Sequence, residues 1–484
     1  MKIKRRILAL LCLCVFLFSA CAGEQDHGLD PNEPTTVTIW HYYNGIQQDT
    51  FDSMIIEFNE TVGLEHGIVV EARSKGVVSE LSDSVLAALR QEAGAEEAPS
   101  MFAAYAETAY TADRLGRVAD LSKYFTDEEL SEYVDGYVDE GRIDSDGGLK
   151  IFPTAKSTEV MMVNLTDWKA FADSEGVTTD MLSTWEGLAE VAKKYYDYTD
   201  ALTPDVPNDG RAFFGRDSVA NYMIVGAKQL GLEYFTADGD SFTMHEDKEA
   251  LRKLWQCYYV PYVSGHFLSQ ARYRSDDCKT GAIIAMVCST PGATYFPTSV
   301  TLDDEYTYPI EGLVLPVPNF EGTDPYVVQQ GAGMVVVKSD EKTEYACSVF
   351  LKWLTEQERN TQFSANSGYL PVKKAANDFD VLAEAYAAAG NADNEALIDT
   401  VRIAVEEIDN YKMYAAKPFE KSAESRDFLD TFMQGTSQSA HDEAALRIEN
   451  GEDRDAVLSE YTSDAAFDIW YQDFISGLQA AVGK

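Results

Sequence analysis

The chain has 484 residues, of which 45% are hydrophobic and 12% aromatic, and its formal net charge is −42 at pH 7. This length and apolar content suit two large domains with buried cores and exclude a globally disordered chain. A surface this acidic repels phosphate backbones, so nucleic acid is excluded as a partner.

The first twenty residues have the pattern of a secretory signal. A basic start precedes an apolar run over residues 7–18, and small residues follow. A helix needs about 20 apolar residues to span a bilayer, so the run favours a cleaved signal over a transmembrane anchor. Residues 17–21 resemble a bacterial lipobox, with Phe18 where that motif usually has Leu. We therefore expect removal of residues 1–20 and lipidation of Cys21, which would anchor the protein on the extracytoplasmic face of the cell membrane.

The next segments predict a tether and then an alternating α/β fold. Residues 21–35 are polar and contain Pro and Gly, as in a flexible tether. A strand pattern follows at residues 36–40, and apolar side chains at i, i+3, i+4 and i+7 predict a helix over residues 51–58, with Asp49 as its N-cap. The same alternation continues with a strand at 67–72, a helix at 81–93 and a strand at 99–105. This order is typical of a mostly parallel sheet.

Two segments predict crossings between lobes. The β-rich runs 149–153 and 159–164 are separated by residues 154–158, which we interpret as the first crossing, and residues 311–318 would cross back. After Pro371 the chain is mainly helical. The predicted first lobe combines residues 36–154 and 311–370. The predicted second lobe combines residues 155–310 and 371–484.

Motifs for catalysis are absent from the sequence. It contains no G-x-S-x-G, no phosphate-binding loop and no H-E-x-x-H, so we expect neither an enzyme nor a cofactor or metal site. With 81 acidic residues, a glycosidase-like carboxylate pair stays open as an alternative, and so does a surface adhesion module. Four cysteines follow Cys21 without a C-x-x-C pair, and their disulfide state is left open: Cys257, Cys278, Cys288 and Cys347.

Several short segments occur in an order that resembles the family 1 extracellular solute-binding proteins of ABC importers. They are residues 37–41, 57–59, 98–100, 119–121, 153–160, 331–333 and 367–371. The resemblance implies a two-lobed periplasmic-binding-protein-like (type II) α/β fold. Each lobe would be a mostly parallel sheet flanked by helices, with a helical C-terminal region. It also implies a monomer that delivers a small polar solute to membrane permease subunits.

The sequence is most similar to the glycerol-3-phosphate-binding subgroup of that family. The matching positions imply six ligand-binding residues: Ser157, Ser289, Thr290, Gly331, Tyr369 and Arg426. Val78 and Ser79 stand where the subgroup has Tyr-Glu, and Ala106 replaces another Glu. We therefore expect a carbohydrate or a related solute, with glycerol-3-phosphate or a glycerophosphodiester as the alternative.

Each of these residues has an expected role and an ordinary alternative. The hydroxyls of Ser157, Ser289 and Thr290 would contact ligand at strand ends, although Ser157 could simply cap a turn. Gly331 would let the backbone approach the ligand, or would only satisfy turn geometry. Tyr369 would offer a ring face, or belong to the core. Arg426 would bind hydroxyls or an anion, or pair with acidic neighbours on the surface.

Overall fold

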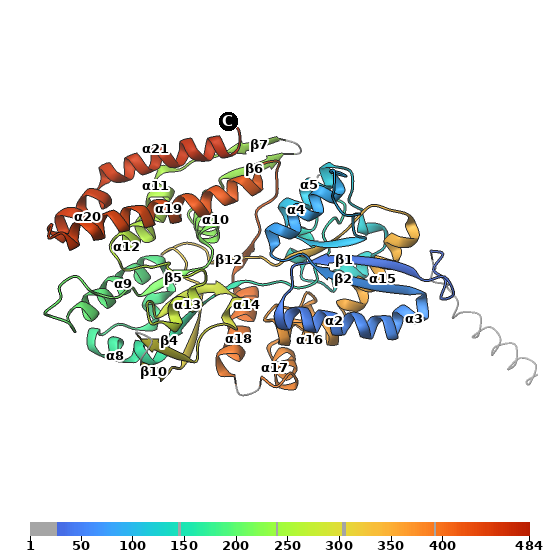
Figure 1. The fold of residues 1–484 in the computed structure, drawn as a ribbon, viewed down its shortest axis with the longest axis horizontal. Coiled ribbons are helices and arrows are strands. Elements are labelled where there is room, and N and C mark those ends of the chain that lie inside the picture. The colour runs from blue at the N-terminus through green and yellow to red at the C-terminus, as the bar shows by residue number, and fades with distance from the viewer. Residues whose placement is uncertain (1–26, 144–146, 239–240, 303–305, 392–393) are drawn as a thin grey trace, which may run out of the picture.

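The chain forms two α/β lobes that lie side by side (Figure 1). The computed structural model describes residues 27–143, 147–238, 241–302, 306–391 and 394–484. The predicted signal peptide and Cys21 lie outside these residues. Each lobe contains its own four-stranded sheet, as the expected fold class requires.

The sheet of the first lobe has the strand order β13-β3-β1-β2. Its strands are β1 (Thr35–His41), β2 (Ile68–Ser74), β3 (Met101–Ala104) and β13 (Gly333–Val336). Strands β1, β2 and β3 are parallel, and β13 is antiparallel to β3. The helices of this lobe are α2 (Gly45–Glu60), α3 (Val62–His66), α4 (Val78–Leu89), α5 (Ala106–Arg114), α6 (Asp127–Ser131), α7 (Asp135–Glu140), α15 (Glu341–Leu354) and α16 (Gln357–Ser367).

Helix α2 shows what the apolar spacing could and could not predict. The four side chains at the helical spacing, Phe51 to Phe58, are all buried, as expected. The predicted N-cap is wrong, because α2 begins at Gly45 and its N-cap is Asn44 rather than Asp49. Residues 45–50 are partly or fully exposed. This first part of α2 therefore has no buried apolar residues at helical spacing from which the start of the helix could be predicted.

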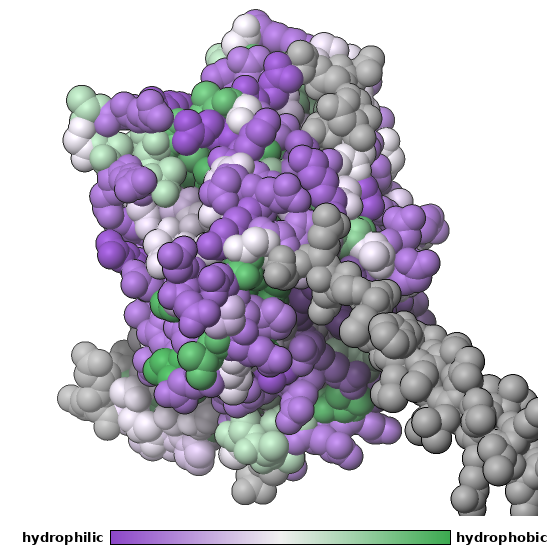
Figure 2. Space-filling view, turned by 90° about the vertical axis from the view of Figure 1, so that its right-hand side faces the viewer, coloured by the Kyte–Doolittle hydropathy of each residue, from purple (hydrophilic) through white to green (hydrophobic). Residues whose placement is uncertain are grey.

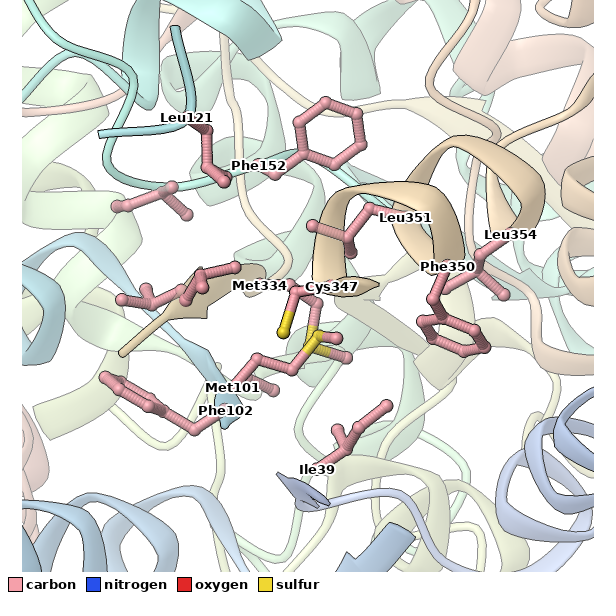
Figure 3. Packing of buried hydrophobic residues seen from close by; sticks show 14 of the residues in the cluster. Ile39, Met101, Phe102, Leu121, Phe152, Met334, Cys347, Phe350, Leu351 and Leu354 are labelled. Atoms are coloured by element: carbon pink, nitrogen blue, oxygen red, sulfur yellow. The ribbon is translucent and has the colours of Figure 1, made fainter. Parts of the chain in front are cut away.

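The core of the first lobe lies between its sheet and α15. Figure 3 shows Met101 and Met334 from the sheet beside Cys347 and Phe350 of α15, and all four are fully buried. The four cysteines beyond Cys21 are all buried and free, which answers the open disulfide question. Burial raises the pKa of each of these thiols, so they behave as core side chains of low reactivity.

The sheet of the second lobe has the order β11-β4-β8-β5. Its strands are β4 (Glu159–Asn164), β5 (Phe214–Arg216), β8 (Ala285–Ser289) and β11 (Gly312–Pro316). Strand β4 is antiparallel to both its neighbours, and the other three share one direction. In each lobe the reversed strand, β4 or β13, is the one that follows a crossing. A strand that enters from the other lobe does not need the right-handed helical connection that joins parallel strands.

The second lobe also contains helices and two short hairpins before the return crossing. The helices before the return crossing are α8 (Leu165–Glu175), α9 (Trp185–Asp200), α10 (Val219–Gln229), α11 (Lys248–Cys257), α12 (Tyr259–Val263), α13 (Arg274–Lys279) and α14 (Thr290–Ala293). The two hairpins are β6 (Phe235–Asp238) with β7 (Ser241–Met244), and β9 (Ser299–Leu302) with β10 (Tyr306–Pro309).

The C-terminal region is mainly helical, as predicted. Its elements are α17 (Phe379–Ala388), α18 (Glu395–Asn410), β14 (Lys412–Tyr414), α19 (Ser422–Glu449), α20 (Arg454–Thr462) and α21 (Asp464–Ala481). Helix α18 packs on β4 and β11, and the long α19 packs on α10 and α12 (Figure 1). This arrangement places the first turns of α19 beside the boundary between the lobes.

The predicted return crossing is misplaced. Residues 311–318 were expected to cross back, but β11 pairs with β4 inside the second sheet. The chain returns through β12 (Tyr326–Val328), which pairs with β14, and then reaches β13 in the first sheet. A short apolar run has the same local pattern in either lobe, and only strand pairing decides to which lobe it belongs.

Part of the predicted tether is folded. Leu29 is buried in the core of the first lobe, and the His27 ring lies 4.1 Å from that of Tyr345. The Nδ1 atom of His27 is also 2.8 Å from a carboxylate oxygen of Glu341. His27 and Leu29 therefore pack on the first lobe, residues 31–34 are exposed, and residues 21–26 of the predicted tether lie outside the described residues.

The outer end of the first lobe is largely hydrophilic, with scattered apolar side chains (Figure 2). The exposed apolar residues of α2 and α3 include Ile46, Ile56 and Leu64. Within the described ranges, no helix has both the length and the apolar character needed to cross a bilayer.

Candidate ligand-binding site

A cavity of ≈ 770 Å³ lies between the two lobes. The first lobe contributes residues from the starts of α4 and α5 and from the end of α7. The second lobe contributes α10, the segment before β6 and the first turns of α19. Residues 328–330 and 414–419, which follow the paired strands β12 and β14, complete the lining.

Arg426 is the one predicted ligand residue that lines this cavity. It lies in the second turn of α19 and is half-buried. Its Nη2 donates to Oδ1 of Asn221 at 2.6 Å, so the guanidinium is held by α10 rather than by its acidic sequence neighbours. Arg426 also interacts electrostatically with Tyr105 of the first lobe. Its contact with a ligand stays a prediction.

Tyr369 lies behind the cavity and not in its lining. Its ring is buried, and its hydroxyl is 3.1 Å from the hydroxyl of Tyr42. Tyr42 in turn contacts Tyr105, whose side chain lines the cavity. Burial raises the pKa of all three phenols, so they remain neutral and can pass hydrogen bonds from one to the next. The structure thus favours a supporting position for Tyr369.

Ser157 and Gly331 belong to the two crossings and do not line the cavity. The backbone N–H of Ser157 donates to the carbonyl oxygen of Gln330 at 2.9 Å, and that of Gln330 donates back at 3.0 Å. Gly331 has φ +98°, and a Cβ there would be 2.7 Å from the carbonyl oxygen of Ala155. The glycine is therefore required where the crossings pack against each other, and the expected approach to a ligand is not what explains it.

Ser289 and Thr290 lie at the end of β8, as expected, but outside the cavity lining. Oγ of Ser289 accepts the backbone N–H of Gly292 at 3.1 Å and so caps α14. Thr290 is 1% exposed, and its hydroxyl has no hydrogen-bond partner among the described residues. The end of β8 thus contributes no residue to the lining, and the structure does not bring these two residues together with Arg426 there.

Sequence patterns did not identify most residues that do line the cavity. Asp217 directly follows β5, Asn221 lies in the first turn of α10, and Gln330 lies in the return crossing. The one available signal was the polar Arg-Asp-Ser after the short run Phe-Phe-Gly at residues 213–215, since ligands bind at strand ends in open α/β sheets. No local motif marks Gln330.

The cavity is acidic. Its lining carries six carboxylates and two cations, namely Glu107, Glu140, Asp217, Glu233, Asp427 and Asp430 against Lys417 and Arg426. Some of these charges have partners, since Glu140 accepts from Lys156 at 2.8 Å and Glu233 from Lys228 at 3.1 Å. Burial raises the pKa of Asp217. The arrangement offers many hydrogen-bond acceptors and few groups that attract an anion.

Aromatic side chains form another part of the lining. Tyr105 comes from the first lobe, and Phe235, Tyr414 and Phe419 from the second-lobe side. The rings of Phe235 and Phe419 lie 4.8 Å apart. Such rings give an apolar platform next to the polar groups, the usual composition of a small-molecule site.

A buried ion pair supports the wall on the second-lobe side. The guanidinium of Arg216 donates to both carboxylate oxygens of Glu159, at 2.9 and 2.8 Å, and lies 5.5 Å from the ring centroid of Trp185. Asn221 donates to the same carboxylate at 2.8 Å. This network fixes the start of β4 and the start of α10 relative to each other.

Comparison with known proteins agrees with this geometry. Residues 53–394 match the model of the bacterial extracellular solute-binding protein family. The chain belongs to this family. No curated protein matches the sequence of this solute-binding protein significantly. As a member of an extracellular family, it acts outside the cytoplasm. The family is defined by the binding of solutes and not by a catalytic activity.

Solved structures with a similar fold are numerous. The cyclic alpha-maltosyl-1,6-maltose binding protein of Arthrobacter globiformis has a TM-score of 0.64 at 18% identity and covers 92% of this solute-binding protein and 100% of its own chain. UgpB of Mycobacterium tuberculosis, solved with glycerophosphocholine, has a TM-score of 0.62 at 18% identity, with 93% and 98% covered. A Listeria monocytogenes ABC substrate-binding protein, solved with cycloalternan, has a TM-score of 0.60 at 17% identity, with 85% and 98% covered. At these identities the likeness establishes the fold.

Proposed function

We propose that the chain is the lipid-anchored substrate-binding component of an ABC importer that captures a carbohydrate or a related small polar solute. The observation that carries the proposal is the ≈ 770 Å³ cavity between two lobes of a solute-binding fold. Sites for small ligands usually measure about 300–1,000 Å³, so the cavity has room for one. The lobes would bind solute in an open form, close about the crossings and dock on permease subunits.

The lining favours a hydroxyl-rich solute. Aromatic rings suit the apolar faces of sugar rings, and carboxylates and amides accept hydrogens from hydroxyl groups. The excess of carboxylates over cations disfavours an anion. Two of the similar structures, those from Arthrobacter and Listeria, are of proteins named for or solved with oligosaccharides.

A glycerophosphodiester or glycerol-3-phosphate is the second candidate. One observation favours it. Arg426 lines the cavity and makes one described hydrogen bond, so its other N–H groups can donate to a phosphate. UgpB, with a similar fold, was solved with glycerophosphocholine.

A thermal-shift screen tests these candidates. The probes are maltotriose, methyl α-glucoside, glycerol-3-phosphate and glycerophosphocholine. A ligand that binds only the native state raises the unfolding free energy by about 2.7 kcal/mol at 100 times its Kd. A shift with a saccharide alone supports the first proposal, and a shift with a phosphate ester alone replaces it with the second. If turnover of a glycan accompanies binding, the proposal of a non-catalytic binding protein fails.

A further inference from the structure

Asn221 occupies an unusual position between the cavity and the two crossings. It is the third residue of α10, only 1% exposed, and it contributes to the cavity wall. Its side-chain amide makes three hydrogen bonds. Oδ1 accepts from Arg426 at 2.6 Å, and Nδ2 donates to Glu159 at 2.8 Å and to Gln330 at 3.2 Å.

The chemistry of these partners allows one orientation of the amide. A guanidinium only donates hydrogen bonds and an ionised carboxylate only accepts them, so Oδ1 must face Arg426 and Nδ2 must face Glu159. Rotating the amide by 180° would break both bonds. The carboxamide is therefore held between a donor and an acceptor. The donor is Arg426 in the cavity lining, and the acceptor is the buried Glu159.

One acceptor lies in the return crossing, and the other lies directly after the outward crossing. Glu159 is the first residue of β4, directly after the outward crossing, and its carboxylate is clamped by Arg216. Gln330 lies in the return crossing, where its backbone pairs in both directions with Ser157. Asn221 therefore hydrogen-bonds the return crossing directly, and it hydrogen-bonds the residue that follows the outward crossing.

The third partner faces the ligand side. Arg426 is half-buried in the cavity lining, and its bond to Asn221 is the one described hydrogen bond of its guanidinium. A solute bound to its remaining N–H groups would reposition the guanidinium and so alter that bond. A change at Asn221 would then reach Gln330 through a single further hydrogen bond.

We propose that Asn221 is the positioning residue that couples occupancy of the cavity at Arg426 to the paired crossings at Ser157 and Gln330. The proposal rests on the proposed binding function, because coupling has a purpose only if a solute occupies the cavity. Coupling between two sites is reciprocal, so a crossing held by Asn221 also presents Arg426 in the orientation that binds. Asn221 need not touch the solute to play this part.

Hydrogen exchange of the ligand-free protein tests the structural half of the proposal. In Asn221→Ala we expect the backbone N–H groups of Ser157 and Gln330 to exchange about tenfold faster. The matched control is Asn164→Ala. Asn164 is also a buried asparagine of the second lobe, but its two described side-chain hydrogen bonds are both to Asp167, and it does not line the cavity. Unchanged exchange in Asn221→Ala, or an equal increase in the control, would overturn the proposal.

A double-mutant cycle tests the relay itself. Arg426→Ala should also speed exchange at Ser157 and Gln330, and this increase should vanish in the Asn221→Ala background. Full additivity of the two changes contradicts a relay through Asn221. If Asn221→Ala does not fold, Gln330→Ala replaces it, because this half-buried side chain carries the link between Asn221 and the return crossing.

A binding experiment tests the part of the proposal that concerns the ligand. It uses the saccharide or phosphate ester that gives the largest thermal shift in the screen. Asn221→Ala should weaken its binding by about tenfold and reduce the lobe closure that small-angle X-ray scattering detects on addition. Undiminished closure and affinity in this variant sink the inference and leave the proposed function intact. Absence of binding by the wild-type protein to every probe sinks the proposed function, whereas the exchange experiment still reports on Asn221.

Discussion

Arg426 lines the cavity, and its guanidinium donates one described hydrogen bond, to Asn221. We predict that this guanidinium donates to the solute, so Arg426→Ala would remove those donors, and a hydrogen bond from a charged group contributes about 1.5–3 kcal/mol. We expect affinity for the ligand to fall roughly 10- to 100-fold by isothermal calorimetry. Arg402→Ala is the control, because Arg402 is exposed on α18, pairs with Asp399 and lies outside the cavity lining. Equal affinities for both variants would remove Arg426 from the site.

His41 makes the fold sensitive to acid. Its ring is buried, Nδ1 accepts the backbone N–H of Tyr43 at 3.1 Å, and burial lowers its pKa from 6.5 to about 4. The unfolded chain therefore binds this proton more readily, and stability is lost as pH falls from 6.5 to 4, by on the order of 3 kcal/mol. His41→Asn keeps an acceptor for Tyr43 but does not titrate.

Urea unfolding at pH 7, 5.5 and 4.5 measures this effect. His41→Asn should be less stable than the wild type at pH 7, because a smaller side chain leaves a cavity, but it should lose less stability on acidification. His245→Asn replaces an exposed histidine and serves as the control. Parallel curves for the wild type and His41→Asn would show that His41 does not contribute.

Glu407 has the opposite dependence on pH. It is fully buried in α18, where its carboxylate accepts from the backbone N–H of Val317 at 2.9 Å and from Thr158 at 3.4 Å, and burial raises its pKa well above 4.5. The folded state thus favours the protonated carboxyl, and stability is lost as pH rises from about 4.5 towards the raised value.

Glu407→Gln keeps the shape and an acceptor for Val317 but cannot ionise. We expect it to be more stable than the wild type at pH 8, on the order of 1–3 kcal/mol, with a smaller difference at pH 5. Thermal unfolding across this range measures the difference, and Glu406→Gln on the exposed side of α18 is the control. A difference that shrinks as pH rises would contradict the assignment.

At the scale of elements, the packing of the two crossings depends on Gly331. A Cβ at this position would lie 2.7 Å from the carbonyl oxygen of Ala155 and 3.0 Å from Cα of Lys156. Gly331→Ala should therefore destabilise the fold by about 1–3 kcal/mol in urea unfolding, through both positive φ and steric conflict. Gly322→Ala separates these causes, because Gly322 also has positive φ but has open space around it. Equal losses in both variants would mean that the close approach to Ala155 has no cost of its own.

At the scale of the whole molecule, the predicted lipid on Cys21 decides where the protein resides. A multiply acylated cysteine holds a protein at a membrane, since each buried CH₂ contributes about 0.8 kcal/mol. In a bacterial host that lipidates such signals, we expect Cys21→Ala to move the protein from the membrane fraction into the medium. Cys257→Ala, at a buried thiol of the folded body, is the control. Retention of Cys21→Ala at the membrane would refute the anchor.

Local pattern by itself determined the α/β class, the first strands and helices and the helical C-terminal region, because burial imposes fixed spacings on apolar residues. It also pointed to Arg426, although only through resemblance to a family. It could not place β11 in the second sheet, since strand pairing joins residues far apart in the chain. Nor could it find Asn221 or Gln330.

Tertiary structure alone separated the predicted site residues. Ser157 and Gly331 lie where the two crossings pack together. Tyr369 hydrogen-bonds Tyr42 outside the cavity lining, and Ser289 caps α14. The cavity wall is built where α10, α19 and the return crossing meet, and the three segments are widely separated in sequence. A side chain acquires its role there from partners that only folding brings within hydrogen-bond distance, and no local pattern encodes that distance.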